Sequence, residues 1–354
     1  MASSAPLDQY LVNHPDYFWG RSPERALINP DNLIILTNHV RCAAFELPFK
    51  EGERFGRVEV EEILHFLVEE DVLYHSDRQY HWMEDSFPAA EISLRSAARE
   101  NVVIIDTTHP KRKVVGEIDR FSAPMLVHEE AIYIHGGLQY QVEKLDLEEK
   151  KAFVRQVSVN YYTDANLSVD LKVLEMFEEK RNSVNLAWGE VRVNALVSMF
   201  KKIRFQTHEN IGSGPVKLPE SEMHTTAFWL SFPEDALQDM HPSAVQSGLI
   251  GLSYLAAHIA PLFLMGDARD LKPVCQVKAP FTGLPTLYLY DNFPGGVGYS
   301  QSLYNAWQDI LKAAKEMIFT CSCEDGCPSC IGPVEEVGER GKEYTLRLLE
   351  VVLS

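Results

Sequence analysis

The chain has 354 residues, of which 45% are hydrophobic and 24% are charged, and its formal net charge at pH 7 is −18. This length gives room for two or three domains and a sizeable core, and the composition is ordinary for a soluble globular protein. The negative charge argues against a surface that binds nucleic acid throughout, but it leaves room for a local basic groove.

The cysteines and the first residues indicate the compartment. Four of the six cysteines lie between positions 321 and 330, which leaves only Cys42 and Cys275 elsewhere. This distribution argues against a disulfide framework and for a reducing compartment, so we expect a cytoplasmic protein. Residues 1–6 have no basic start and lead into no long apolar run, so we expect no signal peptide.

The chain is predicted to begin with a connector followed by a helix that ends before Pro48. Residues 5–28 combine Pro and Asn with several aromatic residues and have the character of a connector. A helix is predicted from Asn29, a plausible N-cap, with Pro30 at the first helical position, where its missing N–H costs nothing. Its apolar residues recur at spacings of three and four and end before Pro48: Leu33, Leu36, Val40, Ala43 and Leu47.

A second helix and a hairpin complete a small module at residues 29–95. The helix is predicted over about 58–70, and residues 72–75 and 79–82 flank Ser76-Asp77-Arg78, which is a hairpin signal. Helices followed by a short β-hairpin are typical of a winged-helix module. Such modules often contact DNA, but many bind proteins instead, so the pattern leaves both functions open.

Residues 96–180 change character and predict a small β-barrel. Short strand candidates are separated by glycine and charged turns at a spacing typical of barrels, at residues 102–105, 114–118, 131–134, 138–142 and 152–154. Gly136-Gly137 is a candidate two-residue hairpin turn. We interpret this barrel as a scaffold or interaction module rather than a catalytic site. Further strands are expected at 171–174, 189–193 and 203–205.

The segment 181–217 is locally basic in an acidic chain. It holds six Lys or Arg residues against two Glu residues, with aromatic residues between them. Such a segment can hold a nucleic-acid backbone and stack bases, so Lys201, Lys202 and Arg204 are candidate DNA contacts. A solvated sheet face with core aromatics on its other side explains the same alternation. Residues 211–215 are predicted to form a turn, and not a phosphate loop, because the Gly-Lys-Ser/Thr ending is missing.

A long apolar stretch follows at residues 247–266. It contains no charge except a possible one on His258. Its length would suit a membrane span, but Pro261, the glycine and serine content and the absence of a partner span favour a buried helix followed by a second element. We predict that this helix begins near Ser243, a possible cap.

A glycine-rich turn links a buried strand, predicted at 287–290, to a helix predicted at about 302–319. Strand, glycine-rich turn and helix form the geometry that aims backbone N–H groups at an anion. Gly295, Gly296 and Gly298 are therefore candidate contacts to a DNA phosphate. A tight turn at which only glycine fits explains the same pattern.

That helix leads into four cysteines, Cys321, Cys323, Cys327 and Cys330, spaced C-x-C-x3-C-x2-C. Four thiolates match a structural Zn²⁺, which takes four protein ligands and leaves no open position, and Gly326 suits the tight turns required. Two disulfides or four unrelated thiols are the alternatives, and the compact spacing favours a metal. An iron–sulfur cluster also uses four cysteines, and we prefer zinc.

No catalytic residue is predicted in this chain. The sequence contains no G-x-x-x-x-G-K-[ST] loop for ATP, no H-E-x-x-H and no G-x-S-x-G, and no paired-carboxylate signature stands out. Cys42 and Cys275 lack the local features of a nucleophile and are expected to pack in the core. His208 and His224 are possible ligands, but four cysteines already fill a tetrahedron.

Several segments together resemble a known family. They are PLDQYL at 6–11, RSPE at 21–24, NPDN at 29–32, VNYYT at 159–163, KIRF at 202–205, EMHTTAFW at 222–229, residues 291–298 and the cysteine cluster. This set resembles the C-terminal region of the MrfA (YprA) mitomycin repair factor family of superfamily 2 DNA helicases. The resemblance covers almost the whole chain, and the cysteine run and the PGGVG segment at 294–298 are its most specific parts.

The resemblance implies an ATP-dependent 3′→5′ DNA helicase that takes part in DNA repair. Two RecA-like motor domains would precede this chain, would alone bind ATP and Mg²⁺, and would connect to it through residues 1–28. A zinc-binding domain at 181–354 would take its four ligands from the cysteine cluster. The implied partners are single-stranded DNA, the motor domains of the same polypeptide and a repair nuclease, with no membrane, in the cytoplasm at the nucleoid.

We therefore predict an α+β multidomain chain with a winged-helix-like module at 29–95, a β-barrel-like domain at 96–180 and an α/β zinc-binding domain at 181–354. It would be the accessory region of a repair helicase, guiding single-stranded DNA or positioning the motor. The alternative is a protein-interaction or regulatory module whose acidic surface does not contact DNA.

Overall fold

The structure is a computed structural model, and it describes residues 3–20, 29, 32–92 and 101–354. The chain divides into two compact units that are described separately. Unit 1 comprises residues 1–32, 171–193 and 224–354, and unit 2 comprises residues 33–170 and 194–223. The predicted mixed α/β fold with a winged-helix module is confirmed.

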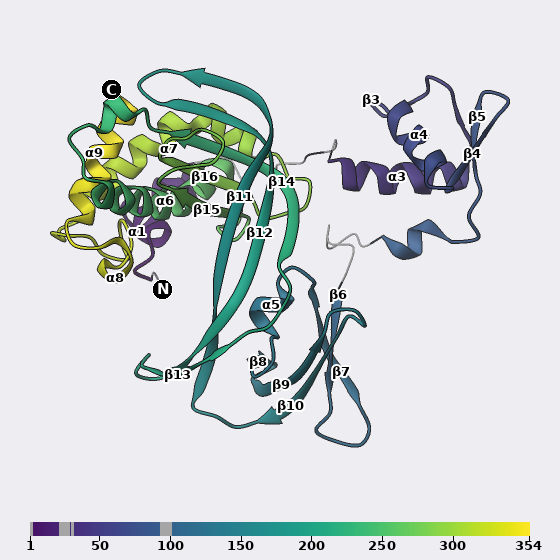
Figure 1. The fold of residues 1–354 in the computed structure, drawn as a ribbon, viewed down its shortest axis with the longest axis horizontal. Coiled ribbons are helices and arrows are strands. Elements are labelled where there is room, and N and C mark those ends of the chain that lie inside the picture. Colours follow the sequence, from purple (N-terminus) through teal and green to yellow (C-terminus); the bar gives the residue numbers. More distant parts are fainter. Residues whose placement is uncertain (1–2, 21–28, 30–31, 93–100) are drawn as a thin grey trace. The chain divides into compact units, whose positions relative to one another are not determined.

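Unit 2 begins with a small module of two helices and short strands (Figure 1). Its elements are α3 (Leu33–Glu46), β1 (Phe49–Lys50), β2 (Arg54–Phe55), β3 (Val58–Glu59), α4 (Glu61–Glu69), β4 (Leu73–Ser76), β5 (Gln79–Trp82) and the 3₁₀ helix η1 (Pro88–Glu91). Leu36 and Val40 of α3 share a buried core with Leu64 of α4. The proposed helix start at Asn29 includes Pro30, which lies outside the described residues.

The hairpin predicted in this module is confirmed. β4 and β5 pair antiparallel, with Ser76 opposite Gln79, and β1 pairs with the other edge of β5. Asp77 and Arg78 between the strands have φ values of 51° and 64°. Two successive residues with positive φ form the tight turn that matches the twist of the flanking strands.

The next segment of unit 2 forms a five-stranded sheet in the order β7-β6-β10-β9-β8. The strands are β6 (Asn101–Asp106), β7 (Lys113–Asp119), β8 (Ile132–His135), β9 (Leu138–Asp146) and β10 (Lys151–Val157), with the short helix α5 (Ala123–Leu126) between β7 and β8. β6 and β10 are parallel, and the other pairs are antiparallel. Gly136 and Gly137, both with positive φ, form the predicted turn between β8 and β9.

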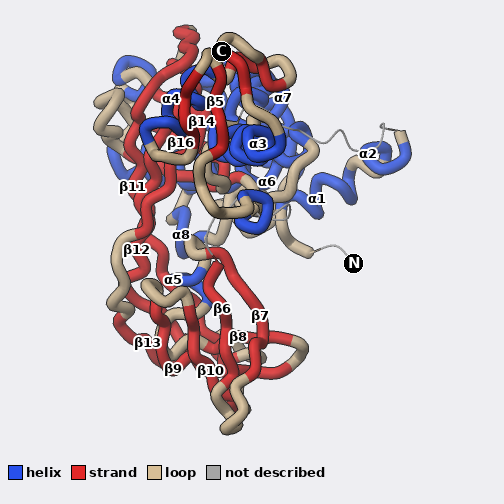
Figure 2. The backbone as a smooth tube through the Cα atoms, turned by 90° about the vertical axis from the view of Figure 1, so that its right-hand side faces the viewer, coloured by secondary structure: helices blue, strands red, loops and turns tan. Residues whose placement is uncertain are grey.

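Two long strands, β11 (Tyr161–Arg181) and β12 (Asn185–Arg204), are drawn in red in Figure 2. Each of them contributes residues to both units. They replace the shorter strands expected at 171–174, 189–193 and 203–205. The turn predicted at 211–215 is wrong, because these residues belong to β13 (Asn210–Pro215), which pairs with β12. The glycine at 214 permits close packing, since a Cβ there would lie 2.6 Å from the Phe200 ring.

The main sheet has the order β11-β12-β14-β16-β15, with β13 attached to β12. Its remaining strands are β14 (Ser221–Ser231), β15 (Leu271–Gln276) and β16 (Thr286–Asp291). β16 pairs antiparallel with both β14 and β15, and all six of its residues are buried. The buried strand predicted at 287–290 is therefore confirmed.

Unit 1 also contains helical elements. They are α1 (Pro6–Asn13), α2 (Asp16–Trp19), η2 (Glu234–Leu237), α6 (Pro242–Leu264), α7 (Tyr299–Thr320), α8 (Val334–Val337) and α9 (Gly341–Leu353). Of these, α6 and α7 pack on the sheet, and α1, α8 and α9 pack on α6. α6 is long and apolar enough to cross a membrane by length and composition, but 72% of its most apolar window is buried inside the protein. The buried helix is thus confirmed, although its N-cap is His241, which accepts from the Ser243 N–H, and not Ser243 itself.

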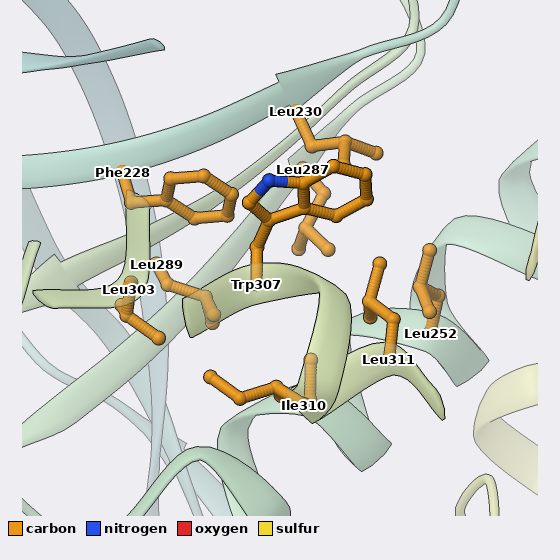
Figure 3. Close-up of a pocket in the computed structure, with 10 residues that line it drawn as sticks. Phe228, Leu230, Leu252, Leu287, Leu289, Leu303, Trp307, Ile310 and Leu311 are labelled. Atoms are coloured by element: carbon orange, nitrogen blue, oxygen red, sulfur yellow. The ribbon is translucent and has the colours of Figure 1, made fainter. Parts of the chain in front are cut away.

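The core between the sheet and the helices contains a small cavity of about 20 Å³ (Figure 3). Figure 3 shows Trp307 of α7 reaching toward Phe228 and Leu230 of β14. Every lining residue is apolar or aromatic. A cavity without polar partners stays dry and has no group to orient a ligand, so it is a packing defect and not a binding site.

Candidate metal centre and glycine loop

The four cysteines that follow α7 converge on one point. Their sulfur atoms all lie within 4.8 Å of one another, and Cys330 is buried. Cys321 is 3.5 Å from both Cys323 and Cys327, Cys323 is 3.5 Å from Cys330, and Cys327 is 3.7 Å from Cys330, measured between Sγ atoms. All four are free cysteines, because a disulfide requires a separation of about 2.05 Å.

These separations fit one tetrahedral ion. Zn–S bonds of about 2.3 Å place the sulfurs of a regular tetrahedron about 3.8 Å apart. An iron–sulfur cluster attaches its cysteines to different iron atoms with sulfide between them, which requires more widely separated thiolates. Burial raises the pKa of Cys330 and the pKa of Cys323, so thiolates at these positions need a cation to offset the cost of burial.

The loop reaches this geometry through two turns after the end of α7. The Cys321 N–H donates to the Met317 carbonyl as the helix ends, and the Cys330 and Gly332 N–H groups both donate to the Cys327 carbonyl. Gly326 has a φ of 136°, and a Cβ there would lie 2.6 Å from Ile331. The tight turn predicted at this glycine is confirmed. A side chain at this position would be strained by the backbone conformation and would collide with Ile331, which explains why the residue is glycine.

Residues outside the loop also hold it. The Lys342 ammonium of α9 donates to the carbonyl oxygens of Cys321 at 2.6 Å and Cys323 at 2.7 Å. The Tyr254 hydroxyl of α6 donates to the Pro328 carbonyl at 3.0 Å. Neither residue belongs to a motif, so no local sequence signal identifies them.

The glycine loop between β16 and α7, residues 292–298, surrounds a carboxylate of the protein itself. The buried Asp291 carboxylate accepts from the backbone N–H groups of residues 297, 298 and 299 through Oδ2, at 2.8, 3.1 and 3.2 Å. Its Oδ1 accepts from the Ser300 N–H at 3.1 Å and the Ser300 hydroxyl at 2.7 Å. Burial raises the pKa of Asp291, and the hydrogen bonds from Ser300 and the backbone act against that rise.

The N–H groups of Gly295 and Gly296 are also paired inside the protein. The Gly295 N–H donates to the His224 carbonyl and the Gly296 N–H to the Phe293 carbonyl. The helix start therefore does aim N–H groups at an anion, as predicted, but that anion is Asp291. Contact between DNA and Gly295, Gly296 or Gly298 stays a prediction, and it loses the donors on which it was based.

Close packing explains the glycines instead. The buried Asn32 amide donates to the carbonyls of Pro294 at 3.1 Å and Gly296 at 2.6 Å. A Cβ at Gly295 would lie 2.7 Å from the Asn32 amide nitrogen, and one at Gly296 would lie 2.3 Å from the Thr226 hydroxyl. Both glycines have positive φ as well, so the tight-turn interpretation accounts for their identity.

Comparisons with known proteins identify the domains that carry these features. The family described as MrfA Zn-binding domain matches residues 252–331, which include all four cysteines, and the winged helix domain of ATP-dependent helicase HRQ1 matches residues 28–97. The uncharacterized ATP-dependent helicase YprA of Bacillus subtilis is 53% identical over 99% of this chain and 47% of its own length. The chain is thus similar to the C-terminal region of the MrfA (YprA) helicases.

Other relatives agree with this assignment. A crystal structure of the DUF1998 helicase MrfA bound to DNA is 52% identical, with a TM-score of 0.62 over 99% of this chain and 47% of that one. ATP-dependent helicase HRQ1 of Saccharomyces cerevisiae is 26% identical over 94% of this chain and 32% of its own length. The chain thus spans about half of the MrfA (YprA) relatives and a third of HRQ1.

The three basic candidates of unit 2 do not form one surface. Lys202 and Arg204 lie on one face of β12, and Lys201 lies on the other, because side chains alternate along a strand. The Lys202 ammonium is 3.2 Å from Glu130, and the Arg204 guanidinium is 3.6 Å from Glu209. Lys201 is exposed, and no ion pair is recorded for it within the described part of the chain.

The other candidate residues have structural roles. The Cys275 thiol donates to the Leu249 carbonyl at 3.3 Å, and burial raises the pKa of Cys275 to about 11, which makes it a poor nucleophile. Burial also raises the pKa of Cys42. Among the described residues, the group suited to a metal contains the four cysteines of the loop and neither His208 nor His224.

Proposed function

We propose that this chain is the accessory region of an ATP-dependent DNA helicase that acts in DNA repair and moves 3′→5′. The observation that carries this proposal is the 52% identity, over 99% of the chain, to a helicase described as bound to DNA. The motor domains of the same polypeptide would bind ATP and Mg²⁺ and supply the chemistry. The accessory region would guide single-stranded DNA or position the motor, in the cytoplasm at the nucleoid and with a repair nuclease as a partner.

The proposal includes a structural zinc ion held by Cys321, Cys323, Cys327 and Cys330. Four thiolates complete a tetrahedron and leave no position for water, so the ion would stabilise the fold without taking part in hydrolysis. Elemental analysis of the purified chain tests this proposal, and we expect about one zinc per chain. Iron together with visible absorbance would instead establish an iron site and refute the zinc assignment.

Lys201 is the best-placed of the three basic candidates for DNA, because Lys202 and Arg204 each lie beside a carboxylate. Binding of single-stranded DNA to the chain, measured over a salt series, tests the DNA-guide role. We expect Lys201→Ala to weaken binding and lower the salt dependence, and Lys172→Ala, at an exposed lysine of β11, to leave both unchanged. Absence of binding at low salt would refute the role, since phosphate contacts strengthen as salt falls.

The winged-helix module supports a second function, protein interaction. Residues 33–92 contain thirteen acidic and five basic residues, so this segment carries much of the negative charge of the chain. Its helix α4, which precedes the hairpin and thus has the position of a recognition helix, contains three glutamates and no lysine or arginine. Such a helix is repelled by phosphates, which favours contact with the motor or another protein over contact with DNA.

The two functions predict different results for a single variant. Glu62 is an exposed residue of α4. If α4 contacts DNA, Glu62→Lys should tighten binding of single-stranded DNA by the chain and steepen its salt dependence, because it adds one phosphate contact. If α4 faces a protein, DNA affinity should remain as in the wild type.

A further inference from the structure

Lys342 directs its charge at the cysteine loop. It lies in the first turn of α9, and it reaches back over 21 and 19 residues to the carbonyls of Cys321 and Cys323. Its side chain is half-buried, and no ion pair is recorded for it among the residues that the structure describes. The guanidinium of the nearby Arg340 is engaged elsewhere, since both of its hydrogen bonds go to the Glu343 carboxylate, and only the Arg340 backbone N–H reaches the loop, at the Asp325 carboxylate.

The position of this ammonium group suits a thiolate centre. A divalent ion with four thiolates keeps an excess of negative charge, and the carbonyl end of α7 adds the negative end of the helix dipole. The loop itself contributes Glu324 and Asp325 and no basic residue between positions 321 and 333. A cation fixed against two of the ligand-bearing residues offsets this charge and fixes their backbone orientation.

Residues other than Lys342 pack α9 against the rest of unit 1. It packs on α6 at two glycines, where a Cβ at Gly251 would lie 2.2 Å from the Thr345 hydroxyl and one at Gly248 would lie 2.9 Å from Leu348. Leu348 and Leu349 are completely buried in the core of unit 1. Removing the ammonium group should therefore leave α9 folded and in place.

We infer that Lys342 is a positioning residue of the metal centre, which holds Cys321 and Cys323 in ligating geometry and slows loss of the ion. The inference rests on the proposed zinc site and goes beyond it, because it assigns metal retention to a residue outside the cysteine cluster. Partners of metal ligands typically change metal affinity by about 10- to 100-fold when they are replaced.

The test is the rate at which the zinc-loaded chain releases its metal to an excess of a chromogenic chelator. Lys342→Met keeps the length of the stem and removes the charge and the donors, and we expect release about 10- to 100-fold faster than in the wild type. Lys342→Arg keeps a cation and donors and should give an intermediate rate. Lys312→Met is the matched control on α7, where the lysine is exposed and pairs with Asp309, and we expect the wild-type rate.

Unfolding of the zinc-free chains separates positioning from general stability. We expect wild type and Lys342→Met to have the same unfolding free energy without zinc. The inference would be overturned if Lys342→Met released zinc at the wild-type rate. It would also be overturned if Lys342→Met lost as much unfolding free energy, relative to the wild type, without zinc as it does with zinc. If the methionine variant does not fold, Lys342→Gln replaces it, and equal release rates for the glutamine and arginine variants would overturn the inference. A wild-type chain that binds no zinc would overturn the zinc site itself.

Discussion

Asp291 is the acceptor for five hydrogen bonds at the start of α7, and its removal should destabilise unit 1. In Asp291→Ala, four backbone N–H groups and the Ser300 hydroxyl lose their acceptor in a buried site. Each buried donor left unpaired costs about 1–3 kcal/mol, and water entering the space left by the carboxylate would satisfy some of them. We therefore expect a loss of about 3–5 kcal/mol, which is a large part of the total for a typical domain.

The isosteric variant separates charge from shape. Asp291→Asn can place its oxygen toward the three N–H groups of residues 297–299 and its amide toward Ser300, whose hydroxyl can rotate to accept. The conflict with the Ser300 N–H and the lost charge remain, so we expect a smaller loss of about 1–3 kcal/mol.

Urea unfolding followed by tryptophan fluorescence measures both effects, since Trp229 and Trp307 lie in unit 1. Asp309→Ala, at an exposed position of α7, is the control and should change stability by no more than about 0.5 kcal/mol. Amide hydrogen exchange at residues 297–300 should accelerate in Asp291→Ala and not in the control. A loss below about 1 kcal/mol in Asp291→Ala would show that these hydrogen bonds do not hold the helix start.

Three further predictions test other parts of the chain. Cys327→Ser should lose the metal and lower the melting temperature of unit 1, and unchanged metal content and melting would contradict the proposed site. Gly296→Ala should destabilise by about 1–3 kcal/mol, because of its positive φ and the Thr226 hydroxyl, whereas Gly136→Ala has open space and should cost less in urea unfolding; equal losses would refute the packing argument. Burial lowers the pKa of His128, so the folded chain stays neutral there while the unfolded chain takes up a proton below pH 6.5. This histidine therefore costs no stability above that pH, and the unfolding free energy decreases as the pH drops below it. Melting temperatures measured at about pH 7.5 and about pH 5.5 should differ less for His128→Asn than for the exposed control His39→Asn.

The sequence by itself predicted the elements whose pattern is contained within a short stretch of residues. Apolar residues at helical spacing located α3 and α4, and the glycine pair Gly136-Gly137 located the turn between β8 and β9. The cysteine spacing located the candidate metal centre for the same reason, since its four thiols lie within ten residues and the geometry of a tetrahedral ion restricts how they can be arranged.

Only the tertiary structure decided which distant groups meet. The glycines at 211–215 predict a turn, yet pairing with β12 makes them a strand, because a backbone partner outweighs a weak local preference. The sequence pattern at 291–300 predicts an anion at a helix start, but only the fold shows that Asp291 itself supplies the anion. Lys342 reaches the cysteine loop because α6 holds α9 beside it, and nothing in the local sequence of α9 records that contact.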